Sequence, residues 1–139
     1  MPKLYTLSAY ETSAQDFFES LRENKIDLVL DVRLKNSNQL CGFSKRKDLE
    51  YLIPAITGAA YVHDLRFAPD DVLLERYLHK WCSWQEYSEA YQAQMRKNKI
   101  PALFKALYGS YKNICILGTA TKKRRSHSEA LEELLSKKK

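Results

Sequence analysis

Two apolar runs in this 139-residue chain restrict its fold more than any other feature of the sequence. Residues 26–32 and 113–118 are almost continuously apolar. A strand of this kind is buried on both faces, as in parallel sheets that carry helices on both sides. An alternating strand at residues 3–8 precedes the first run by one helix, so the order strand, helix, strand predicts a right-handed crossover. We therefore expect an α/β protein.

Helix signals separate the predicted strands in the first half of the chain. Thr12 or Ser13 offers an N-cap to a first helix, whose apolar face comprises Ala14, Phe17, Phe18 and Leu21. Ser44 caps a second helix, which should end or kink at Pro54 because the proline ring clashes with the preceding turn. A short strand at residues 60–63 follows. This half therefore predicts three strands and two helices.

The second half begins with about 30 residues of helical pattern from Pro69 onward. Ser83 and Glu86 form a capping-box pattern, which predicts a break near Cys82 and two helices instead of one. The first carries an apolar stripe that we expect to pack in the core: Leu73, Leu74, Tyr77, Leu78 and Trp81. The second carries a stripe of its own: Trp84, Tyr87, Tyr91 and Met95.

Two further helices complete the expected fold. Pro101 opens a short helix that should stop near Gly109, and Ser126 or Ser128 caps a final helix. Its core face comprises Leu131, Leu134 and Leu135. Four strands alternating with helices predict one compact α/β domain over residues 1–139, with a mainly parallel sheet of about four strands flanked by helices.

Composition excludes several classes of protein. With 45% hydrophobic and 29% charged residues, the chain has neither a disordered nor a coiled-coil composition. No apolar run reaches the roughly 20 residues of a membrane span, and the N-terminus does not follow the pattern of a signal peptide. Three cysteines without a Cys-x-x-Cys pair indicate neither a disulfide framework nor a zinc site. We therefore expect a cytoplasmic protein with no membrane contact, metal or cofactor.

Polar residues at the ends of the predicted strands mark a candidate site. In parallel α/β sheets the ligand crevice lies at the carboxyl ends of the strands, which selects residues 31–33, 63–66 and 119–127. Asp31 and Arg33 project to the same side because side chains alternate along a strand. They either form a structural ion pair or hold a substrate together.

The last loop carries most of the positive charge. The final 21 residues hold seven basic and three acidic residues, so +4 of the net +6 lies there. Because helix N-termini favour anions, we interpret this loop as a phosphate-binding segment: Thr119, Thr121, Lys122, Lys123, Arg124, Arg125, Ser126 and Ser128. His127 adds a donor or a general acid, although the neighbouring cations disfavour its protonation. The simpler alternative is a solvated basic loop in which a serine only caps the helix.

Other reactive side chains form no comparable pattern. His79 and Cys82 are three residues apart, but two ligands without a second pair do not make a metal site. Cys41 lies in a predicted loop, and nothing in the sequence indicates a lowered thiol pKa. The aromatic residues lie mostly at helical core spacing, which favours packing over a base-stacking surface.

A set of short motifs resembles a known family. Asp31-Val32-Arg33 is followed by Gly42-Phe43-Ser44-Lys45 and by Tyr61 and His63 in a Tyr-x-His strand, and Tyr5-Thr6-Leu7 precedes them. In these motifs the chain resembles the bacterial and archaeal domain-of-unknown-function family numbered 488. The resemblance implies the α/β fold and a site made of Asp31, Arg33 and the last loop, without an established reaction.

The chain departs from that family in its last loop. Members typically end the last strand in a Cys-x-Glu segment and enter the last helix through Cys-His-Arg. This chain has Gly118-Thr119-Ala120 and Ser126-His127-Ser128 at the equivalent places. Thiol or glutamate chemistry of other members is therefore not expected here.

Two hypotheses of function follow from these residues. In the first, the protein binds a phosphate-containing ligand, either a nucleic acid or a nucleotide, through Arg33, His127 and the basic residues 122–125. In the second, it is a hydrolase or transferase for a small anionic substrate, with Asp31 as base or as aide to a nucleophile, Arg33 as clamp and His127 as acid. A basic protein-interaction module is a third reading, and whether the chain is an enzyme stays open at this stage. Both main hypotheses require Asp31, Arg33 and His127 to converge on one cavity.

Overall fold

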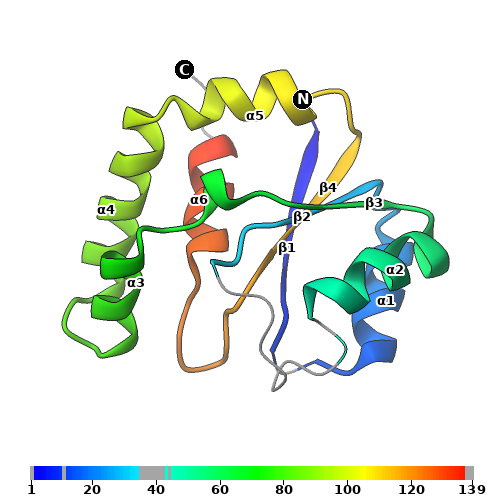
Figure 1. Cartoon of the computed structure of the whole chain (residues 1–139), viewed down its shortest axis with the longest axis horizontal. Helices are drawn as coiled ribbons and strands as arrows, with labels where there is room; N and C mark the ends of the chain where they lie inside the picture. Colours follow the sequence, from blue (N-terminus) through cyan, green and yellow to red (C-terminus); the bar gives the residue numbers. More distant parts are fainter. Residues whose placement is uncertain (1, 11, 35–42, 44, 137–139) are drawn as a thin grey trace.

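The sheet has the expected parallel arrangement. The structure is a computed structural model that describes residues 2–10, 12–34, 43 and 45–136. Its four strands are all parallel and lie in the order β1-β4-β2-β3. Their bounds are Lys3–Ser8 for β1, Leu28–Asp31 for β2, Ala60–His63 for β3 and Asn113–Gly118 for β4. The strands predicted near residues 3, 26 and 113 are thus adjacent and parallel, which confirms the predicted architecture (Figure 1).

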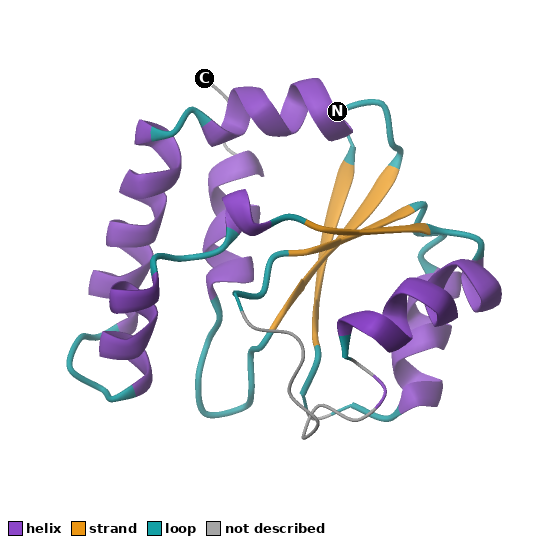
Figure 2. Cartoon of the chain, viewed as in Figure 1, coloured by secondary structure: helices purple, strands orange, loops and turns teal. Residues whose placement is uncertain are grey.

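Helices cover both faces of the sheet in a single compact domain (Figure 2). One face is covered by α1 (Ala14–Glu23) and α2 (Arg46–Thr57). The other is covered by α4 (Trp84–Lys97), α5 (Ile100–Tyr108) and α6 (His127–Ser136). A short 3-10 helix, η2 (Leu65–Phe67), and α3 (Asp71–Leu78) lead from β3 to α4. None of the helices in the described part of the chain is long and apolar enough to cross a membrane.

Alternate side chains of the strands fill two separate cores. Leu28 and Leu30 of β2 point toward α4, α5 and α6, whereas Val29 points toward α1 and α2. Ile114 and Cys115 of β4 divide in the same way. This two-sided burial explains why both strands read as continuous apolar runs.

Several element boundaries follow from local signals. Ser13 caps α1 by accepting a hydrogen bond from the Asp16 amide at 3.0 Å. Ser83 and Glu86 form the complete capping box at the start of α4. Pro101 lies in the first turn of α5, which ends at Gly109 as expected.

Two predicted boundaries of α2, its end at Pro54 and its cap at Ser44, differ in the structure; the alternative of a kink at Pro54 stays a prediction. The helix does not end at Pro54 but continues to Thr57 and stops at Gly58, which has a left-handed φ of 76°. Pro54 is exposed while Ile53 is buried, so the carbonyl that the proline leaves without an amide partner can bond to water. The N-cap residue is Lys45, with no side-chain capping bond, and the predicted cap Ser44 lies outside the described residues.

The predicted burial of Trp81 is wrong. Helix α3 ends at Leu78, and Lys80 adopts a left-handed φ of 62°. The helical period therefore no longer applies at Trp81, whose side chain is 69% exposed. Tyr77, from the same predicted stripe, is buried.

Candidate functional site

Asp31 and Arg33 form a fully buried ion pair directly after β2. The guanidinium donates from Nε to Oδ1 at 2.9 Å and from Nη2 to Oδ2 at 2.7 Å, and the Arg33 amide donates to Oδ1 at 3.1 Å. The exposed fractions of Asp31 and Arg33 are 0% and 1%. Such a bidentate pair fixes the plane of the guanidinium. The sequence allowed two roles for these residues, a structural ion pair or joint binding of a substrate. The structure shows the ion pair.

Strand β3 supplies two further side chains to this pair: His63, which lies in the predicted stretch 63–66, and Tyr61, which lies outside the predicted stretches. The Tyr61 hydroxyl donates to Asp31 Oδ2 at 2.5 Å, and His63 Nε2 donates to the Arg33 carbonyl at 2.8 Å. Burial, and then the carboxylate of Asp31, raise the pKa of Tyr61. The signal that could have found them is the parallel register, which pairs Asp31 with His63.

His127 reaches the same place from the start of α6. Its Nε2 lies 2.6 Å from the Val32 carbonyl, and its ring packs edge-on against Tyr91 with centroids 5.4 Å apart. Burial lowers the pKa of His127 to about 4, against smaller opposing effects of the Val32 carbonyl and Asp31. The ring is therefore neutral at pH 7 and carries its proton on Nε2, because a carbonyl can only accept. The acid role considered for His127 does not suit a neutral ring whose N–H is already in use.

The basic loop forms a tight turn. Thr121 and Arg124 pair through their backbones, with N···O distances of 2.7 and 3.2 Å, so the turn presents Lys122 and Lys123 as exposed residues at its tip. The Thr121 hydroxyl accepts from the Lys123 amide at 3.3 Å. Thr121 thus closes the turn.

Arg125 points away from this turn. Its Nε donates to Glu129 at 2.8 Å, and its guanidinium lies 4.5 Å from the centre of the Trp84 ring. The Arg125 carbonyl accepts a bond from the Tyr77 hydroxyl at 2.9 Å. These contacts fasten the loop to α3 and α4, so the four consecutive basic residues do not act as one cluster.

The two serines at the start of α6 are buried against the end of β4. Ser126 Oγ accepts from the Thr119 amide at 3.2 Å and from the Ser128 amide at 3.4 Å, so Ser126, and not Ser128, caps the helix. A Cβ at Gly118 would lie 2.1 Å from Ser128 Oγ. A residue without a side chain is therefore required at position 118 for α6 to approach the sheet.

These elements enclose a cavity of about 220 Å³, which we call the switch-point cavity. Its lining comprises Tyr10, Arg33, Leu34, Leu74, Leu78, Thr119, Arg124 and His127. After β4 the chain turns to the α6 face, whereas after β1 and β2 it turns to the α1 and α2 face. Ligands of open α/β sheets bind where the connections diverge in this way. Of the predicted residues, Arg33, Thr119, Arg124 and His127 line the cavity and Asp31 holds Arg33.

A second Asp-x-Arg pair repeats this geometry one strand away. Asp64 Oδ1 accepts from the Arg66 amide at 3.1 Å and from Nε at 2.9 Å, and Oδ2 accepts from Nη2 at 2.8 Å and from the Tyr108 hydroxyl at 2.8 Å. Burial alone would raise the pKa of Asp64, but the bonds from Arg66 and Tyr108 together lower it. Arg66 lies at the rim of an open hollow of about 430 Å³ that also includes Lys97.

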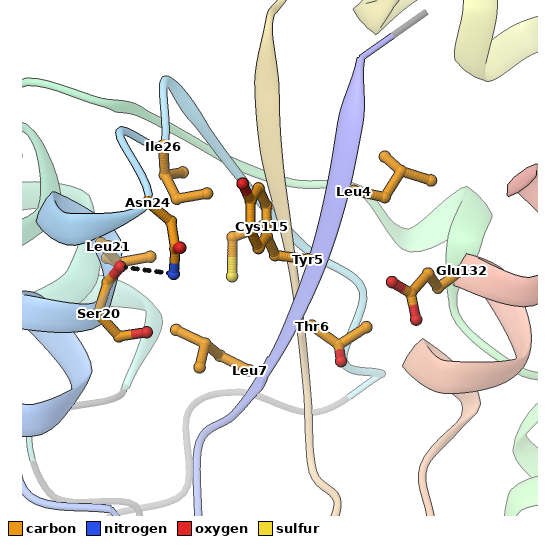
Figure 3. A pocket seen from close by; sticks show the side chains of 10 residues that line it. All are labelled: Leu4, Tyr5, Thr6, Leu7, Ser20, Leu21, Asn24, Ile26, Cys115 and Glu132. Atoms are coloured by element: carbon orange, nitrogen blue, oxygen red, sulfur yellow. Dashed lines mark hydrogen bonds between the residues drawn. The ribbon is translucent and has the colours of Figure 1, made fainter.

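A further hollow of about 240 Å³ follows the edge strand β1 (Figure 3). Tyr5 and Cys115 of the sheet line it together with Asn24 of the α1 end and Glu132 of α6. None of the described residues that line this hollow is basic. It therefore does not suit an anionic ligand.

Some predicted features fall elsewhere. Cys41 and most of the polar loop after Arg33 lie outside the described residues, as does the C-terminal lysine triplet. Among the residues described, no three His, Cys, Asp or Glu side chains gather as metal ligands.

The fold and the cavity together define an α/β domain with a cavity at the switch point of a parallel sheet. Residues 13–135 match the family described as domain of unknown function DUF488, and the chain belongs to this family. The resemblance seen in the sequence motifs is confirmed. Comparison with curated proteins and with solved structures gives no match.

Proposed function

We propose that this protein binds a small ligand that combines a phosphate group with an apolar or aromatic portion, and that a nucleotide is the representative case. The observation that carries this proposal is the composition of the switch-point cavity. Arg124 supplies positive charge and Arg33, whose charge Asp31 balances, supplies a guanidinium in the lining, whereas Leu34, Leu74 and Leu78 supply apolar surface. A phosphate group matches the first part and a base or similar ring matches the second.

The start of α6 adds to the attraction for an anion. His127 is the first residue of this ten-residue helix and lines the cavity. Helix N-termini carry a partial positive charge and backbone N–H groups that favour phosphate. The Asp31 carboxylate orients Arg33 from the side. The volume of about 220 Å³ lies below the roughly 300 Å³ of ordinary ligand pockets, which suits one part of a nucleotide or the end of a longer ligand.

A hydrolase or transferase for the same ligand class is the second candidate, and it rests on the position of the His127 imidazole in the cavity lining, although burial makes this ring a weak base by lowering its pKa to about 4. Because the Nε2–H bonds to Val32, Nδ1 carries the free lone pair and can accept a proton. In this alternative His127 is a base, Arg33 clamps the anion, and Asp31 is a positioning residue because its oxygens already bond to Arg33 and Tyr61.

Calorimetric titration with AMP, adenosine and inorganic phosphate tests the binding proposal. We expect AMP to bind more tightly than either fragment, and Arg124→Gln to weaken AMP binding about tenfold or more, the usual loss of a charge-assisted contact. Arg22→Gln is the matched control, since Arg22 is an exposed arginine on α1 paired with Glu19. Equal affinity of wild type and Arg124→Gln for AMP contradicts the proposal.

Hydrolysis of a phosphate ester separates the two candidates. The protein is an enzyme if wild type releases phosphate from 4-nitrophenyl phosphate or AMP and His127→Gln loses this activity but still binds AMP. Binding without turnover, over hours at high protein concentration, leaves the binding function.

A further inference from the structure

Trp81 is exposed in a manner that packing does not explain. Its side chain is 69% accessible in the turn between α3 and α4. Tryptophan is normally well buried because its ring contributes a large apolar area. The neighbouring Trp84 follows that rule better, since it packs on Tyr77 and Tyr87 and contacts Arg125.

The exposed ring is nevertheless held in one position. The Trp81 and His79 rings stack with centroids 4.7 Å apart and an interplanar angle of 20°. His79 Nε2 bonds to Glu75 at 3.2 Å, and the Trp81 amide donates to the Arg76 carbonyl at 2.8 Å. One face of the indole therefore rests on His79, and the exposed area leaves the other face accessible. This arrangement is a flat platform of the kind that stacks on another ring.

Basic residues lie close to the platform along the chain. Lys80 lies between the two stacked rings in the sequence, and Arg76 precedes them. The basic turn is tied to the end of α3, because the Tyr77 hydroxyl donates to the Arg125 carbonyl at 2.9 Å. The tip of the basic turn, Lys122 and Lys123, is exposed beside Arg124.

The platform lies close along the chain to the switch-point cavity. Leu78, the last residue of α3 and three residues before Trp81, lines that cavity and is itself 38% exposed. The end of α3 therefore carries both a lining residue of the cavity and, in the turn that follows, an exposed aromatic ring. A nucleic-acid strand matches this arrangement, because its bases can stack on an aromatic ring while its phosphates bind basic residues.

We propose that the ligand is a single-stranded nucleic acid, with one phosphate in the switch-point cavity and a neighbouring base stacked on Trp81. This proposal rests on the proposed function, since it takes the cavity to hold phosphate. A duplex fits less well, because its bases are already stacked on each other and a flat platform has no free face to meet. Lys122, Lys123 and Arg124 lie along the backbone, so three phosphates are neutralised.

The number of phosphate contacts predicts how binding depends on salt. Three neutralised phosphates on a single strand predict a slope of about −2 for log K against log salt, since each contributes about −0.7. Arg125 does not contribute, because Glu129 and Trp84 already hold it. Replacing Lys122 and Lys123 with alanine is expected to reduce the slope to about −0.7.

The test compares labelled oligothymidylate, oligoadenylate and the duplex they form, by fluorescence anisotropy at several salt concentrations. Trp81→Phe retains a ring, and Trp81→Leu retains apolar surface without one. We expect Trp81→Leu to weaken single-strand binding about tenfold, from the stacking of one base, Trp81→Phe to recover most of the loss, and duplex to bind more weakly than either strand.

The control variant is Tyr51→Leu, which removes a ring that is 73% exposed on α2, and thermal unfolding verifies that all variants fold. Equal binding by Trp81→Leu and wild type overturns the proposal, as does an oligonucleotide that binds no more tightly than AMP. AMP binding that still depends on Arg124 then leaves the proposed function intact. A third outcome is that wild type binds no oligonucleotide and self-associates, and that Trp81→Leu loses this self-association. This result identifies the platform as a protein contact and also overturns the proposal.

Discussion

Acidification should unfold this protein partly through His127. The pKa of His127 is lowered from 6.5 to about 4 in the folded state, chiefly because burial disfavours the charged ring. The unfolded chain therefore binds a proton at a higher pH than the folded chain does. The free energy of unfolding therefore contains a contribution from His127 that is fully present above pH 6.5. This contribution decreases as the pH falls below 6.5, and it is lost by about pH 4. A difference of this size corresponds to about 3 kcal/mol at about 1.4 kcal/mol for each pH unit.

The comparison that isolates this effect is wild type against His127→Gln in urea unfolding at several pH values. The glutamine amide can still donate to the Val32 carbonyl but does not titrate. Between pH 7.5 and 5 the wild-type free energy of unfolding should fall by about 2 kcal/mol more than that of the variant. Other titrating groups are common to both proteins and cancel. Parallel pH profiles for the two proteins would refute a buried, neutral His127.

Three substitutions test the packing around the site, each by urea unfolding at pH 7. Tyr61→Phe should destabilise the fold by about 2 kcal/mol, because the buried Asp31 carboxylate loses a donor; an unchanged midpoint contradicts that bond. Tyr87→Phe should raise stability by about 1 kcal/mol, because the Tyr87 hydroxyl is buried without a hydrogen-bond partner among the described residues; a loss of stability indicates a partner. Gly118→Ala should cost roughly 1–3 kcal/mol, because its Cβ meets Ser128, and a neutral effect shows that α6 can move.

Local sequence signals were sufficient where a single short-range interaction decides the structure. The capping box at Ser83 and Glu86 satisfies backbone groups within one turn, so it places the start of α4 without reference to the rest of the fold. Pro54 shows the limit of this reasoning. The proline removes one helical bond, but the packing of Leu49 and Ile53 against the sheet outweighs that loss.

The candidate site was predictable in part, because the strand-end rule depends only on topology. It places residues after β2 and β4 at one edge, and Arg33, Thr119, Arg124 and His127 do line one cavity there. The rule could not show that Arg125 turns away to Glu129 and Trp84. Neighbouring residues of the same charge look equivalent in a sequence, whereas their directions depend on the helices beside them.

The α/β class, the parallel sheet and the edge that carries the candidate site all follow from the sequence, because apolar period and strand order are properties of the chain. Tertiary structure alone decided the state of each side chain at that edge. His127 is neutral because the fold removes it from water, the buried Asp31 carboxylate receives a bond from Tyr61 of β3, and Trp81 is exposed because α3 ends at Leu78. Desolvation and hydrogen bonding between distant segments set these states, and neither is a property of any local stretch of sequence.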